Sequence, residues 1–372
     1  MPARKGERFI LDGPGPLVEA LRAQGWRVVG PKARQGAIVY DEIESIADLP
    51  RGLTDEQDGG RYRLVEGDAE RWFDYVVGPQ NWKKILFPAR QKLWSATRSE
   101  NGFELEPHEA EWTRTAIFGA RACEIAAIEI QDRVFDNGDF ADAGYRKRRS
   151  DMLIVAVQCA RSAATCFCAS MNTGPRADSG YDIALTELDE DGLLVECGSD
   201  AGAAILGAMD LRKADAGDVE AAQQVSARAA AMQTRAMPDG IDTVLRDNPD
   251  HPRWAEVAER CLSCANCTLA CPTCFCSDVE EVNDLSGDHA ERWRVWDSCF
   301  SLDFSYIHGG AVRRSTLSRY RQWMTHKLSS WHDQFGTSGC VGCGRCIAWC
   351  PVGIDITEEA SAIAATTPAQ EV

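Results

Sequence analysis

The sequence lacks the features of an exported or membrane-spanning protein. Its N-terminus has no apolar core of the signal-peptide kind, and no stretch approaches the roughly 20 apolar residues that a membrane span needs. No Gly-x-Gly-x-x-Gly motif follows an expected strand, and no P-loop motif occurs, so no dinucleotide fold or nucleotide triphosphatase is indicated. We therefore expect a cytoplasmic protein without membrane association.

Histidine is scarce and positive charge is outnumbered. The chain has six histidines, none of which pairs at a spacing typical of metal binding or catalysis. Its 40 Lys and Arg against 57 Asp and Glu give a formal net charge of −17, which repels nucleic acid and anionic membrane surfaces. The sequence predicts protein partners and offers no catalytic site of its own.

The chain is long enough for two or three packed domains, with 372 residues of which 44% are hydrophobic. Its first part alternates β-rich runs with helical periodicity, which is typical of an α/β domain. The expected strands are 37–40, 115–119, 152–158, 183–187 and 193–196, and the expected helices are 16–24, 123–134 and 219–232.

Turn-forming residues separate this region from the rest of the chain. Met237-Pro238-Asp239-Gly240 and the proline-containing stretch 248–252 both favour turns. We place a linker at residues 236–253, between an α/β domain of residues 1–235 and a second domain of residues 254–372.

Cysteine is abundant and clustered. A disulfide framework is a poor explanation for sixteen cysteines without an export signal, because cytosolic thiols are kept reduced. Eleven of the sixteen lie between Cys261 and Cys350. Ligation of metal or of clusters is the better interpretation.

Eight of these cysteines form two runs with one spacing, Cys-x2-Cys-x2-Cys-x3-Cys-Pro. The first run spans Cys261 to Cys271 and the second spans Cys340 to Cys350. This is the bacterial ferredoxin pattern, in which the fourth cysteine of each run ligates the cluster of the other run. The sequence thus predicts two [4Fe–4S] clusters, cluster 1 on Cys261, Cys264, Cys267 and Cys350, and cluster 2 on Cys340, Cys343, Cys346 and Cys271.

Zinc is the alternative, since Cys-x2-Cys pairs also build tetrahedral sites, but zinc does not require this longer run twice.

The stretch between the runs exceeds what a ferredoxin needs. The expected fold is an α+β or α/β N-terminal region followed by a split, insertion-containing two-cluster bacterial ferredoxin-like domain. Within the insertion, Trp293 and Trp296 are typical of a core, and the basic segment 313–327 of a solvated or salt-bridged face, with a docking surface as the alternative.

Cysteines outside the two runs suggest a third cluster. Cys159 ends an expected strand, Cys166 and Cys168 follow closely, and Cys123 begins a helix after another strand, so all four are expected at one edge of a parallel sheet. Our hypothesis is a third [4Fe–4S] cluster on Cys123, Cys159, Cys166 and Cys168, with packing as the alternative. Three more, Cys274, Cys276 and Cys299, are interpreted as packing around the clusters or as replacement ligands, and Cys197 as a core residue.

Segments along most of the chain match the pattern of a known family. They are 30–31, 37–40, 77–83, 118–124, 166–168, 174–175, 180–182, the two cysteine runs and 296–299. On these segments the chain closely resembles the family that contains the beta subunit of cytosolic nickel–iron sulfhydrogenases and the A subunit of anaerobic sulfite reductase. Where that family has Arg-Pro-Cys-Asp, this chain has Arg121-Ala122-Cys123-Glu124, which keeps the cysteine and leaves the role of the acid open.

The resemblance implies a non-catalytic iron–sulfur subunit of a soluble multi-subunit NAD(P)-linked nickel–iron hydrogenase. Such a subunit relays electrons between a flavin subunit that binds NAD(P) and the hydrogenase small subunit, which accompanies the large subunit. The equivalent subunit of a sulfite or other sulfur-compound reductase is the nearest alternative, with a different catalytic partner. A zinc-binding scaffold and a self-contained oxidoreductase are the alternatives from other classes.

Overall fold

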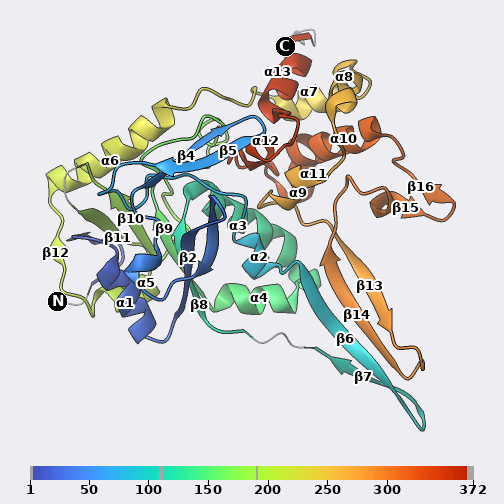
Figure 1. Cartoon of the computed structure of the whole chain (residues 1–372), viewed down its shortest axis with the longest axis horizontal. Coiled ribbons are helices and arrows are strands. Elements are labelled where there is room, and N and C mark those ends of the chain that lie inside the picture. The colour runs from blue at the N-terminus through green and yellow to red at the C-terminus, as the bar shows by residue number, and fades with distance from the viewer. Residues whose placement is uncertain (1–2, 109–111, 190–191, 367–372) are drawn as a thin grey trace.

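An eight-stranded sheet organises the N-terminal part of the computed structural model, which describes residues 3–108, 112–189 and 192–366 (Figure 1). The strand order is β12-β1-β11-β10-β9-β8-β2-β3, and the four strands from β10 to β2 are parallel. The strands are β1 (Arg8–Leu11), β2 (Arg27–Arg34), β3 (Ala37–Glu42), β8 (Thr115–Ala120), β9 (Met152–Val157), β10 (Ile183–Glu187), β11 (Leu193–Cys197) and β12 (Arg212–Lys213).

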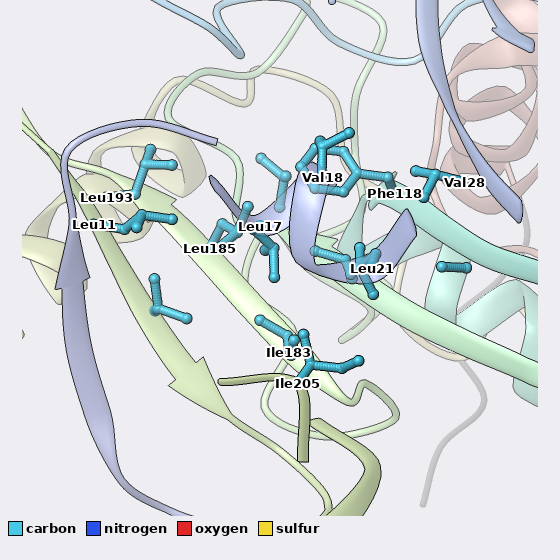
Figure 2. Close-up of a cluster of buried hydrophobic side chains, with 14 of the residues drawn as sticks. Leu11, Leu17, Val18, Leu21, Val28, Phe118, Ile183, Leu185, Leu193 and Ile205 are labelled. Atoms are coloured by element: carbon cyan, nitrogen blue, oxygen red, sulfur yellow. The ribbon is translucent and has the colours of Figure 1, made fainter. Parts of the chain in front are cut away.

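Helices cover both faces of this sheet because its central strands are apolar on both faces. On one face, Phe118 of β8 packs with Leu17 and Leu21 of α1 (Figure 2), and on the other, Ile117 packs with Ile125 of α3. The helices of this region are α1 (Gly15–Ala23), α3 (Ala122–Phe135), α4 (Ala143–Ser150), α5 (Asp200–Leu206) and α6 (Ala216–Ala231). The five strands and three helices expected from the sequence are all confirmed to within a few residues.

A second, four-stranded antiparallel sheet projects away from the rest of the molecule (Figure 1). It joins β6 (Arg90–Ser99) and β7 (Gly102–Pro107) to β13 (Ser277–Asn283) and β14 (His289–Trp296), in the order β13-β14-β6-β7. The segment between the two cysteine runs is therefore paired with a segment of the N-terminal half. No local pattern predicted this pairing.

Helices form the C-terminal part around a separate apolar core. Ile241 and Leu245 of α7, Trp254 of α8 and Met324 of α10 are buried in it, so the stretch where we place the linker is packed and partly helical. No helix in the described ranges is long and apolar enough to cross a membrane. The helices of this part are α7 (Ile241–Asp247), α8 (Arg253–Arg260), α9 (Asn266–Leu269), α10 (Thr316–Thr325), the π-helical η4 (His326–Ser330), α11 (Trp331–Phe335), α12 (Arg345–Ala348) and α13 (Ile356–Thr366).

The remaining elements are short. They are the hairpin of β4 (Leu53–Asp58) and β5 (Arg61–Glu66), the helix α2 (Lys83–Leu86), the pair β15 (Tyr306–Ile307) and β16 (Gly310–Ala311), and the 3-10 turns at Ile46–Asp48, Gly138–Phe140 and Asp303–Ser305.

Candidate iron–sulfur centres

The two cysteine runs fold into matching loops. In each, the residue directly before and the residue directly after the second cysteine have positive φ, at Ser263 and Ala265 in the first run and at Gly342 and Gly344 in the second. A short helix then begins, α9 in the first run and α12 in the second, and it carries the third cysteine. The same spacing therefore produces the same backbone path twice.

Backbone amides point at the sulfurs of both loops. The N–H of Ser263 donates to Sγ of Cys261 at 3.4 Å, and the N–H of Gly342 donates to Sγ of Cys340 at 3.5 Å. Such donors stabilise thiolate and tune the potential of an iron–sulfur cluster.

The fourth cysteine of the second run lies beside the first run. Burial raises the pKa of Cys267 well above its ordinary value, and the nearby sulfurs of Cys261 and Cys350 raise it further. Cys261, Cys264, Cys267 and Cys350 also line one cavity, together with Cys346 of the second run. Its other walls are largely apolar, and it holds ≈ 460 Å³ free of atoms, part of it open to solvent. We call this group site 1.

The fourth cysteine of the first run lies beside the second run. Burial raises the pKa of Cys346 well above its ordinary value, and the sulfurs of Cys340 and Cys271 raise it further. Burial also raises the pKa of Cys340 to about 12. The group of Cys340, Cys343, Cys346 and Cys271 is site 2, and its thiols include the buried Cys340 and Cys343, whereas Cys264 of site 1 is exposed.

Site 2 is buried because its loop packs against the segment 165–168. A Cβ atom added at Gly342 would lie 2.6 Å from Cα of Cys168, and one at Gly344 would lie 2.4 Å from the carbonyl oxygen of Thr165. The N–H of Phe167 donates to the carbonyl oxygen of Gly342 at 2.9 Å. The positive φ favours glycine here, and the close approach of a second backbone leaves no room for a Cβ atom.

The four cysteines of the predicted third cluster are all buried and lie near one another. Burial raises the pKa of Cys123 well above its ordinary value, and the sulfurs of Cys343 and Cys168 raise it further. Burial, then Cys168 and Cys159, act in the same direction on the pKa of Cys166. We call Cys123, Cys159, Cys166 and Cys168 site 3, which adjoins site 2 through Cys343.

The order of the strands explains why the cysteines of site 3 lie close together. β8 and β9 are parallel neighbours, Cys123 starts α3 after β8, and Cys159 follows β9. The carboxyl ends of parallel strands meet at one edge, where open α/β sheets bind their ligands.

Glu124 answers the question that the sequence left open about the acid beside Cys123. Its carboxylate pairs with Arg345 of α12, and both side chains are 1% exposed. Tyr40 donates its hydroxyl to the same carboxylate at 2.7 Å, and Trp82 donates its indole N–H at 3.3 Å. The motifs at 37–40, 77–83 and 118–124 thus meet at the second cysteine run.

Three thiols lie outside the predicted ligand sets, with Cys274 beside Cys271 of site 2, and Cys276 beside Cys299, which lies near Cys267 of site 1. Cys274 and Cys271 hydrogen-bond each other through their side chains. A hydrogen bond from the Cys299 thiol lowers the pKa of Cys276 to about 7. Cys274 and Cys299 therefore lie near predicted ligands of the two runs, in line with the packing interpretation.

Lys327 is a residue whose role the sequence did not reveal. It belongs to the segment interpreted as a solvated face, yet it is buried, and its Nζ lies 3.3 Å from Sγ of Cys271. Burial opposes its charge, but the sulfurs of Cys271 and Cys274 outweigh this and raise the pKa of Lys327 well above its ordinary value. No spacing pattern marks such a residue, because its partner lies far away in sequence.

The other predictions fare as follows. Cys197 lies in the core of the large sheet, as expected of a small apolar residue. Trp296 is half-buried, with its indole N–H donated to the carbonyl oxygen of Phe87 at 2.9 Å. Arg321 bonds the carbonyl oxygen of Pro249 and pairs with Asp250, which agrees with a salt-bridged face for that part of the basic segment.

The residues of sites 1 and 2 fit [4Fe–4S] clusters. Each offers four thiols, N–H donors to sulfur and, in site 1, a cavity that the thiols line. Within the part of the chain that the structure describes, no three His, Cys, Asp or Glu side chains are arranged around a single metal ion.

Comparison with known proteins agrees with this picture. The family model described as "4Fe-4S dicluster domain" matches residues 260–354. The chain is 33% identical to sulfhydrogenase 2 subunit beta of Pyrococcus furiosus over 245 residues, which cover 64% of this chain and 71% of that protein. No solved structure matches. The identity and its coverage, together with the dicluster match, establish that the chain belongs to the family of sulfhydrogenase beta subunits.

Proposed function

We propose that this chain is the electron-transfer subunit of a soluble, cytoplasmic, multi-subunit nickel–iron hydrogenase. It relays electrons between a flavin subunit that uses NAD(P)H and the hydrogenase small subunit, and the large subunit carries out the chemistry. The observation that carries the proposal is that the fourth cysteine of each run lies beside the first three cysteines of the other run. Cys350 lies beside the first run, and Cys271 lies beside the second. This exchange of fourth ligands is characteristic of a two-cluster ferredoxin.

In this proposal the thiolates of sites 1, 2 and 3 each hold one [4Fe–4S] cluster. Such a cluster takes up and releases single electrons, and the protein fixes its position and its potential. Residues 254–372 then form a split two-cluster ferredoxin-like domain with an insertion, following an α/β domain of residues 1–235. The pairing of β14 with β6 would bind the insertion to that domain.

The three sites form a continuous series. Cys267 of site 1 lies near Cys271 of site 2, and Cys343 of site 2 lies near Cys123 and Cys168 of site 3. The exposed Cys264 marks the end of this series that a partner can approach. Leu262 and Val352 are exposed beside it and would give a docking partner apolar contacts.

A second candidate is the corresponding subunit of an anaerobic sulfite reductase, which would use the same three sites. The name of the Pyrococcus furiosus relative favours the hydrogenase. Isolating the tagged full-length chain anaerobically from its native cells, with its partners identified by mass spectrometry, tests the choice. Recovery of a nickel–iron large subunit with a flavin subunit is expected, and recovery of a sirohaem protein would replace the hydrogenase with the reductase.

A further inference from the structure

Lys327 is a buried cation whose polar neighbours are sulfur and neutral oxygen atoms, and its Nζ lies 5.6 Å from the centre of the Trp331 ring. It lies in the π-helical segment η4 between α10 and α11 and is 3% exposed. Its Nζ lies 3.0 Å from the carbonyl oxygen of Gly339, 3.2 Å from Oγ1 of Thr273, and 3.3 and 3.6 Å from Sγ of Cys271 and Cys274. None of these four contacts is with a carboxylate.

Burying an ammonium group costs several kcal/mol unless negative charge lies nearby. Arg345, which lies within the second cysteine run, meets this condition with Glu124. Lys327 meets it with Cys271, a ligand of site 2 under the proposed function. A cluster ligated by four thiolates is anionic, so it supplies the charge that the lysine needs.

The interaction has a direct redox consequence. Each electron that enters a cluster adds negative charge, and a fixed cation within hydrogen-bonding distance of a ligand sulfur stabilises the reduced form. Net charge around the cluster and hydrogen bonds to its sulfurs are the means by which a protein sets the potential. The effect is strong in a buried site because little water screens it.

Site 1 has no comparable group among its described contacts. Its cavity is lined by apolar side chains such as Phe300, Trp323 and Ile354. Arg319 reaches the neighbourhood of site 1, but it donates to Oγ of Ser263 at 3.3 Å and not to a cysteine sulfur.

We propose that Lys327 is a positioning residue that holds the reduction potential of the site 2 cluster above that of the site 1 cluster. The inference rests on the proposed function, since it needs clusters at both sites. The reduction potential then rises from site 1 to site 2, so an electron that arrives at the solvent-facing site 1 moves inward to site 2.

The test is a redox titration followed by EPR on the anaerobically purified full-length chain, comparing wild type with Lys327→Met. The site 2 signal is identified as the one that Cys346→Ser removes. We expect the equilibrium constant for reduction of site 2 to fall at least tenfold, a shift of about 59 mV to more negative potential for a one-electron couple, with site 1 unchanged. An unchanged site 2, or equal shifts at both sites, would overturn the proposal.

Lys83→Met is the matched control. Lys83 is also buried, its Nζ bonds the carbonyl oxygen of Cys274 at 3.1 Å and lies over the ring of Trp296, and none of these contacts is to a ligand sulfur. Its replacement should shift site 2 less than Lys327→Met does. An equal shift would mean that any buried charge in the region acts alike and that Lys327 has no special role.

A second variant, Lys327→Gln, addresses the case in which Lys327→Met fails to assemble the site 2 cluster. Glutamine keeps an N–H donor and loses the charge. If both Lys327 variants lose the site 2 cluster while site 1 remains, the lysine is structural and the proposal fails. Failure of the proposed function would look different, since the wild-type chain itself would then lack iron.

Discussion

The two cysteine runs have the same spacing and the same backbone path, but they differ in what surrounds them. The first run uses Ser263 and Ala265 at its positive-φ positions and leaves Cys264 exposed, whereas the second uses Gly342 and Gly344 and is packed against the segment 165–168. The residue before the third cysteine is Asn266 in one and the buried Arg345 in the other. One motif thus yields a surface site and an interior site, and the sequence of the run alone does not decide which.

The largest effect is expected from replacing the fourth cysteine of each run by serine. Cys350→Ser should abolish or strongly perturb the cluster at site 1, and Cys271→Ser the cluster at site 2, because each lies beside the triplet of the other run. EPR spectra and iron content of both variants check this, with a loss of up to about four irons in each. Damage confined to the run that carries the mutation would refute the crossed ligation.

Site 3 comes next, and it adjoins the second run through Cys343. The double variant Cys166→Ser/Cys168→Ser should lower the iron content from about twelve to about eight per chain while the signals of site 1 persist. Cys197→Ser, a buried thiol in the core of the sheet, is the control and should lose no iron. An unaltered iron content in the double variant would mean that these cysteines are packing residues and hold no cluster.

The buried ion pair between Glu124 and Arg345 of the second run should contribute to the free energy of unfolding. Glu124→Gln leaves the Arg345 guanidinium buried without its counter-charge, so the free energy of unfolding should fall by about 3–5 kcal/mol. Denaturant unfolding followed by tryptophan fluorescence measures it. Asp333→Asn, which breaks the exposed pair with Arg246, is the control and should cost about 1 kcal/mol or less. Equal costs would show that the buried pair does not anchor the run.

Substitutions at positive-φ positions of the two loops should differ in their effect on stability. Gly342→Ala places a Cβ 2.6 Å from the backbone of Cys168 at a φ of 62°, so it should destabilise the chain by at least about 1–2 kcal/mol. Ala265→Gly relieves a left-handed alanine at φ 66° and should be neutral or stabilising by up to about 1 kcal/mol. The same unfolding assay compares them, and a stabilising Gly342→Ala would contradict the packing of the second loop.

Much of the fold was predictable because its signals are local. The apolar runs of β8, β9 and β10 and the alanine-rich α6 are readable from composition and periodicity, and the cysteine spacing predicted which thiols would meet. That Cys271 and Cys350 lie beside the opposite triplets agrees with this prediction, while ligation itself stays a prediction.

What could not be predicted depends on contacts between distant segments. The pairing of β6 with β14 joins residues about 200 positions apart, and neither strand carries a pattern that specifies its partner. Lys327 was interpreted as part of a basic surface because its neighbours in sequence are arginines, and only the fold brings Cys271 to it. Glu124 became interpretable only when Arg345 was found opposite it.

The most direct test of the whole account is the content of iron, acid-labile sulfide and zinc in the full-length chain purified without oxygen. Three [4Fe–4S] clusters predict about twelve irons and as many sulfides per chain, and about eight would keep sites 1 and 2 but remove site 3. Zinc with little iron would contradict the central claim that this chain carries electrons.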